Sequence, residues 1–139
     1  MYRLIQLTVC AAIVLLVAAC GKEETPTSPT PATPTTITEV FSGTINRNGA
    51  ATHAFSSQAS GNLTATLTTL SPDSTLVVGL SIGTLNLTGV CSIVLAKDNA
   101  TQSTAVNGGV SSLATLCVRI YDVGNITEPV SYVITVVHP

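Results

Sequence analysis

Few residues in this chain are of types that do chemistry, and the most suggestive of them is a serine between glycines. Gly79, Ser81 and Gly83 match the pattern G-x-S-x-G, in which a serine nucleophile occupies a sharp turn between a strand and a helix of a large α/β sheet. Here strand-like residues both precede and follow the serine, so neither that helix nor that sheet is expected. A secreted hydrolase is therefore the least favoured function, and we predict that the protein is not an enzyme.

The remaining candidates for catalysis or metal binding are two histidines and one group of oxygen ligands. His53 and His138 have no spacing that suggests a shared site, and we expect both to be partly exposed structural residues. Asp122, Asn125 and Glu128 lie along one glycine-containing segment and are candidate calcium ligands. The alternative, which we favour, is a turn in which Asp and Asn side chains bond to their own backbone. We therefore predict no metal and no cofactor.

The four cysteines fall into two groups. Cys10 lies inside an apolar N-terminal run and Cys20 lies at its end, whereas Cys91 and Cys117 lie in the body of the chain. In an oxidising compartment the second pair is expected to form a disulfide, which for a loop of this length contributes about 3.5 kcal/mol in the chain-entropy model. The alternative is a pair of buried free thiols. Two cysteines and two distant histidines lack the ligand spacing of a zinc site.

The N-terminus has the features of a secretory signal. Arg3 precedes an almost wholly apolar run that is shorter than the ~20 residues of a membrane-spanning helix. The run ends Val17-Ala18-Ala19-Cys20-Gly21, which resembles the lipobox of bacterial lipoproteins. The resemblance implies that a signal-peptide helix, residues 1–19, is cleaved before Cys20 and that the thiol receives lipid. The alternative is an ordinary signal peptide with a chance cysteine.

Lipid on Cys20 makes a membrane the first expected partner of this protein. Lipid adds about 0.8 kcal/mol per buried CH₂, so the two or three acyl chains of a mature lipoprotein hold firmly. In Gram-negative bacteria the residue after the cysteine helps to sort lipoproteins. Because Gly21 is not the aspartate typical of inner-membrane retention, the resemblance implies the outer membrane, with the domain facing the periplasm or the cell surface.

Residues 20–36 join this expected anchor to the rest of the chain. Thr25 to Thr36 reads TPTSPTPATPTT, in which proline removes donors while Thr and Ser stay solvated, so a disordered, extended linker is predicted. From Lys22 it would reach ~45 Å at ~3.1 Å per residue. Charged residues make up only 9% of the chain and the formal net charge is -2. Without a basic face to displace counterions, nucleic acid is excluded as a partner.

From Ile37 to Pro139 the chain shows the period-2 alternation of β-strands. Apolar and mostly polar residues alternate over 62–68, 75–82, 116–121 and 131–137. Turn-forming residues separate the runs, including Lys97 to Asn99 and Asn107 to Gly109. We predict one all-β domain over residues 37–139, an antiparallel two-sheet β-sandwich. With no Trp and two Phe, its core must be mainly aliphatic.

The order of several short motifs in this domain resembles one known family. The motifs are Phe41-Ser42-Gly43, His53-Ala54-Phe55, Gly61-Asn62-Leu63, Cys117 to Asp122 and Tyr132 to Val136. Together they look like the bacterial pre-peptidase C-terminal (PPC) domain, and the resemblance spans nearly all of residues 41–136. It implies a jelly-roll-like β-sandwich that acts as a non-catalytic accessory to secreted enzymes and surface proteins.

Three functions follow from these observations. The leading one is a lipid-tethered binding or accessory module of the cell envelope, with an unidentified protein or glycan partner at its sheet edges or end loops. Tyr121 is the candidate binding residue, because an aromatic ring that shares a face with Arg119 can stack on a sugar. The alternative is a structural or adhesive subunit of a surface assembly joined by strand pairing. A hydrolase is third.

Overall fold

The structure, a computed structural model, describes residues 35–139. The predicted signal-peptide helix, the lipidation site at Cys20 and the linker up to residue 34 lie outside the described residues. Residues 35–139 contain no helix that is long and apolar enough to cross a membrane. Their strands are β1 (Ile37–Ile45), β2 (Ala50–Ser57), β3 (Gly61–Ser71), β4 (Val78–Leu85), β5 (Cys91–Ala100), β6 (Ala105–Val110), β7 (Ala114–Tyr121) and β8 (Val130–His138).

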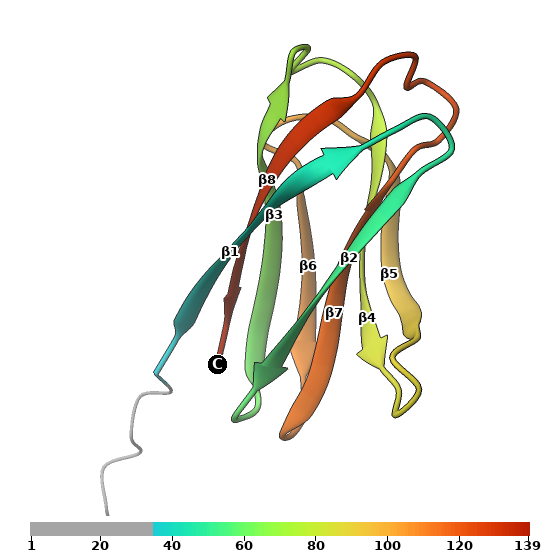
Figure 1. The fold of residues 1–139 in the computed structure, drawn as a ribbon. Helices are drawn as coiled ribbons and strands as arrows, with labels where there is room; N and C mark the ends of the chain where they lie inside the picture. Colours follow the sequence, from blue (N-terminus) through green and yellow to red (C-terminus); the bar gives the residue numbers. More distant parts are fainter. Residues whose placement is uncertain (1–34) are drawn as a thin grey trace, which may run out of the picture. The chain divides into compact units, whose positions relative to one another are not determined.

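The strands pair as if the chain were one antiparallel ribbon folded back on itself at residues 86–90. β4 pairs with β5, β3 with β6, β2 with β7 and β1 with β8. Two further pairings, β3 with β8 and β4 with β7, join these pairs into the sheets β1-β8-β3-β6 and β2-β7-β4-β5. The two sheets face each other in Figure 1. This is an eight-stranded jelly roll, and the prediction of an antiparallel two-sheet β-sandwich is confirmed.

The core lies between the sheets and is mainly aliphatic, as the alternation predicted. Successive side chains of a strand point to opposite faces, and in β3 and β8 the apolar member of each alternating pair is the buried one. Each fully buried Val, Leu or Ile stabilises the fold by roughly 1.5–3 kcal/mol. The inward residues of three central strands are Leu63, Ala65 and Leu67 in β3, Leu116, Val118 and Ile120 in β7, and Tyr132, Ile134 and Val136 in β8.

An aromatic seam of Phe41, His53, Phe55, Tyr132 and His138 closes the side of the sandwich along β1 and β2. The ring of Phe41 stacks on His53 with centroids 4.9 Å apart and lies 6.3 Å from the ring of Phe55. The rings of Phe55 and His138 lie 5.1 Å apart. The seam therefore ties together the outer strands of both sheets, β1 and β2.

The loops gather at two opposite ends of the sandwich. The end at which the described chain enters β1, here called the Ile37 end, also holds the loops 58–60, 86–90 and 111–113. The strand register requires this, because Ile37 pairs with His138, Ser57 with Ala114, Gly61 with Val110 and Leu85 with Cys91. In Figure 1 this end is at the bottom, and the loops 46–49, 72–77, 101–104 and 122–129 form the far end at the top.

The predicted disulfide is present and bends one corner of the sheet β2-β7-β4-β5. Cys91 in β5 and Cys117 in β7 are bonded with their Cα atoms 5.9 Å apart. These strands lie on either side of β4, so a flat sheet would separate them by ~9.6 Å. The carbonyl of Ser92 lies over Gly83 of β4, where an added Cβ would be 2.2 Å from that oxygen. The start of β5 therefore bends over the outer face at Gly83, and the disulfide holds it there.

Replacing both cysteines, Cys91→Ser with Cys117→Ser, should lower the free energy of unfolding by about 3.5 kcal/mol, because the unfolded chain regains the entropy that the cross-link removes. Urea denaturation of the natural and variant proteins measures this difference. A reductant should lower the stability of the natural protein and leave that of the variant unchanged. Equal stability of the two proteins without reductant would show that the cysteines are not bonded in solution.

Candidate functional site

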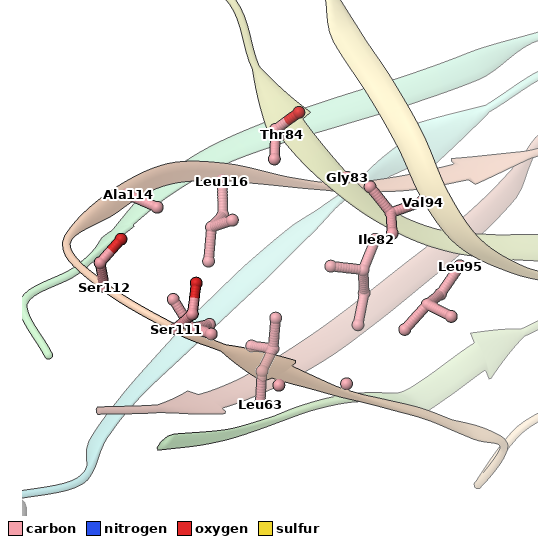
Figure 2. Close-up of a pocket in the computed structure, with 13 residues that line it drawn as sticks. Leu63, Ile82, Gly83, Thr84, Val94, Leu95, Ser111, Ser112, Ala114 and Leu116 are labelled. Carbon is pink, nitrogen blue, oxygen red and sulfur yellow. The ribbon is translucent and has the colours of Figure 1, made fainter. Parts of the chain in front are cut away.

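An apolar groove lies between the edge strands β5 and β6 of the described domain. Its cavity has a volume of about 180 Å³. Figure 2 shows the side chains of Leu63, Ile82, Leu95 and Leu116 turned toward this one space. The lining residues are aliphatic, glycine, serine or threonine, and none of them is charged. The groove therefore suits an uncharged, apolar occupant.

Gly108 keeps the groove open on the β6 side. It pairs with the buried Leu63 of β3 and so faces inward. A Cβ at Gly108 would lie 2.9 Å from Cδ1 of Leu95, so a larger side chain here would fill the space beneath β5. Gly109 faces the opposite way, and a Cβ there would meet only the carbonyl of Gly61 at 3.9 Å. Adjacent glycines of one strand thus have different surroundings.

The two strands that border the groove differ in their ability to accept another strand. β5 departs from regular register with β4 at two places, and such bulges blunt an edge against pairing. β6 keeps unbroken register with β3 from Ala105 to Val110, and its other edge is unpaired. An added strand would therefore pair with β6 and lie along the groove.

Exposed apolar side chains border the groove along β5. Ile93, Val94 and Leu95 are 45%, 67% and 39% exposed. Val94 and Leu95 also line the groove, and exposed apolar side chains that gather at one place mark interaction surfaces. The groove and this border together form the candidate binding site of the domain.

The serine of the G-x-S-x-G pattern lies inside a strand. Ser81 is buried in the middle of β4, and its hydroxyl donates to the backbone carbonyl of Arg119 at 3.4 Å. The strand continues to Leu85 without a turn into a helix. Gly79 and Gly83 are explained by contacts, because the Tyr121 ring covers the first and the Ser92 carbonyl covers the second. Close packing accounts for all three residues of the pattern.

Tyr121, the candidate for stacking on a sugar, is held from several directions. A Cβ at Gly79 would lie 2.1 Å from its ring, and the guanidinium carbon of Arg119 lies 5.4 Å from the ring centroid. Its hydroxyl donates to Asp98. Burial first, and then the hydrogen bond to Asp98, raise the pKa of Tyr121 to about 12. A sugar would have to displace Arg119 to reach the ring, and stacking on Tyr121 stays a prediction.

The candidate calcium ligands belong to a hydrogen-bonded turn. Oδ1 of Asp122 accepts from the backbone N–H groups of Gly124, Asn125 and Ile126, while Oδ2 accepts from that of Asn48. These bonds, that from Asn48 foremost, lower the pKa of Asp122. The side chain of Asn125 donates to the carbonyl of Val77. Residues 35–139 hold no cluster of three or more His, Cys, Asp or Glu side chains arranged for a metal.

The two histidines lie in the aromatic seam. Nε2 of His53 is 2.7 Å from the hydroxyl of Tyr132, and burial lowers the pKa of His53. His138 is 0% exposed, and its Nε2 lies 3.0 Å from Oε1 of Glu39. The expectation of partial exposure holds for His53 and is wrong for His138. The alternation in β8 that predicts a buried Tyr132 and Val136 also places His138 on the inner face.

The sequence did not indicate the groove. Residues 97–99 and 107–109 were expected to form turns, but both segments lie inside strands, β5 and β6. Glycine within a strand marks a bulge or a close approach of other groups, and this was the available signal at Gly108. At residues 107–109 the error arose because Asn-Gly and Gly-Gly are also preferred in tight hairpin turns.

No protein-family model matches this chain, and no curated protein matches its sequence. The resemblances to the lipobox and to the PPC domain therefore stay predictions.

Burial of His53 predicts a pH dependence of stability. Because its pKa is lower in the folded protein than the ordinary 6.5, the unfolded chain binds the proton more readily. The free energy of unfolding should therefore fall as the pH decreases through 6.5 toward the folded-state pKa. The variant His53→Gln should show a smaller fall between pH 7.5 and 5.5 in urea denaturation. The same slope in both proteins would contradict this assignment, whatever their absolute stabilities.

Proposed function

We propose that this protein is a non-catalytic binding module of the cell envelope, tethered by lipid on Cys20, whose groove between β5 and β6 receives an extended polypeptide segment. The groove is the observation that carries the proposal. It combines an uncharged apolar cavity with an unpaired strand edge, and a peptide that adds a strand uses both, since its backbone pairs and alternate side chains enter pockets.

The size of the cavity favours a peptide side chain over a whole small molecule. Sites for drug-sized ligands usually measure ~300–1,000 Å³, whereas this cavity measures about 180 Å³. One or two aliphatic side chains of a strand paired with β6 would fill it. The hydroxyls of Thr84, Ser111 and Ser112 at its border are available to backbone groups of the occupant.

The environment of Ser81 supports a non-catalytic role, because its hydroxyl is buried and bonded to a carbonyl. The resemblance to the PPC domain points the same way, toward an accessory of secreted proteins. The lipobox-like residues before Cys20 and the Pro/Thr-rich linker give the tether. Outer-membrane attachment in a Gram-negative cell is part of this proposal.

The second candidate is a subunit of a surface assembly. The free edge of β1, like that of β6, belongs to a strand in unbroken register with its neighbour, so either edge is able to pair with another copy. The state of the chain in solution separates the two functions. A monomer of residues 35–139 in sedimentation experiments favours the binding module, and ordered oligomers favour the assembly.

The tether predicts that Cys20→Ser moves the protein out of the membrane fraction of the cells that produce it, because the acyl chains have no other attachment point. Cell fractionation and immunoblotting measure this. Cys10→Ser is the matched control, since the proposed cleavage removes Cys10, and it should leave the protein in the membrane. Retention of the Cys20→Ser protein in the membrane fraction at the natural level would contradict the lipid anchor.

The groove is tested by placing a photo-crosslinking amino acid at Val94 and irradiating the cells. Adducts should form at this position, and Gly108→Val should reduce them about tenfold because its side chain fills the cavity and costs at least one buried apolar side chain of the partner. Gly109→Val is the control, because it adds the same side chain to the opposite face of β6. Equal loss with both variants, or no adduct at Val94, would refute the groove as the binding site.

A further inference from the structure

Three strongly exposed apolar side chains lie in the loops at the Ile37 end. Leu87 is fully exposed, at 108%, and Leu113 and Val90 are 69% and 58% exposed. Leu87 and Val90 belong to the turn between β4 and β5, and Leu113 to the turn between β6 and β7. Pairing of Thr84 with Leu116 and of Leu85 with Cys91 brings these two turns together at one end of the sheet.

Charge is distributed unequally between the two ends of the sandwich. The loops 58–60, 86–90 and 111–113 contain no charged residue. The far-end loops carry Arg47, Asp73, Asp122 and Glu128. Toward the Ile37 end, Glu39 is bonded to His138. Because these three loops are uncharged, their projecting apolar side chains can enter the interfacial region of a bilayer without desolvating an ion of their own.

The turn that carries Leu87 pairs several of its own polar groups. Oδ1 of Asn86 accepts from the backbone N–H groups of Thr88 and Val90 and from the hydroxyl of Thr88. The backbone of Asn86 bonds to both Gly89 and Val90, and Gly89 adopts the positive φ of 79° that this tight turn requires. Because these groups are already paired, moving the turn out of water costs little hydrogen bonding.

The chain enters the domain at this same end, and this favours the bilayer as the surface that covers the three loops. The segment between Cys20 and Ile37 reaches ~45 Å when extended, so a lipid on Cys20 confines the domain near the bilayer. This confinement raises the effective concentration of the bilayer surface that the loops meet. A small apolar patch on the loops then suffices for docking. The far end carries charges that oppose the same contact.

We propose that the Ile37 end docks on the bilayer that holds the lipid of Cys20, with Leu87, Val90 and Leu113 in its interfacial region. This inference rests on the proposed lipid anchor. The contact is apolar, so it depends neither on anionic lipid nor on salt, in contrast to docking by basic residues. Docking sets the strands at a steep angle to the membrane and brings the border of the groove at Ser111 and Ser112 close to the membrane surface.

The absence of tryptophan from the chain allows a direct test. The full lipidated protein is prepared with a single tryptophan, as Leu87→Trp, Leu113→Trp or, at the far end, Ser74→Trp. Each is reconstituted into phosphatidylcholine vesicles that contain brominated lipid. Fluorescence of the first two should be blue-shifted and strongly quenched, whereas that of Ser74→Trp should not. Addition of 1 M salt (about a 3 Å screening length) should change neither result.

A second variant separates docking from nonspecific adsorption. In the Leu113→Trp protein, Leu87→Asp with Val90→Asp should reduce quenching about tenfold, because two apolar contacts are replaced by charges, while circular dichroism and the melting temperature show that the fold persists. Mass spectrometry of the mature N-terminus reports the lipid independently. Lipid on Cys20 with no quenching at either loop overturns the docking and leaves the anchor intact. An unmodified Cys20 overturns both. Equal quenching at Ser74→Trp overturns docking by a defined end.

Discussion

The outer strands of a sheet have backbone groups paired on one side only, and side chains from the two sheets must cover the open sides of a sandwich at these strands. When this ribbon folds into two sheets, β1, β2, β5 and β6 become the outer strands. The aromatic seam closes the side of β1 and β2. The groove on the side of β5 and β6 is lined only by aliphatic residues, glycine, serine and threonine, which fill less space than aromatic rings. The groove is the result of that difference in residue size.

Glycines of β4 allow close packing on the outer face of the sheet β2-β7-β4-β5. An alanine at position 79 would collide with the ring of Tyr121, and one at position 83 with the carbonyl of Ser92. Without Gly83 the start of β5 would have no room to bend toward β7, and Cys91 would stay too far from Cys117 for a disulfide. The groove lies next to this corner of the sheet, because Gly83 and Thr84 of β4 line it together with Val94 and Leu95 of β5.

Sequence reasoning recovered the features that follow from local periodicity and from pairs of like residues. Alternation in β3, β7 and β8 predicted the inward face of each strand, and an even pair of cysteines predicted the disulfide. The groove is different, because its residues come from strands far apart in the chain and become neighbours only through the order of strands in each sheet. Gly108 has no local pattern that separates a turn from a strand interior. At His138 the error was of another kind. The residue was expected to be partly exposed because it is polar, although the alternation of β8 places it on the inner face.

The pairing of β1 with β8 alone has a consequence for the order of events during folding. The first strand to leave a ribosome or a translocation channel has no partner until the last one follows, and β2 likewise waits for β7. Contacts this distant in sequence form slowly. The hairpin of β4 and β5 can form early, but the two sheets stay incomplete until synthesis is nearly finished. That is the state in which a polypeptide can be threaded through a membrane before its sheets close.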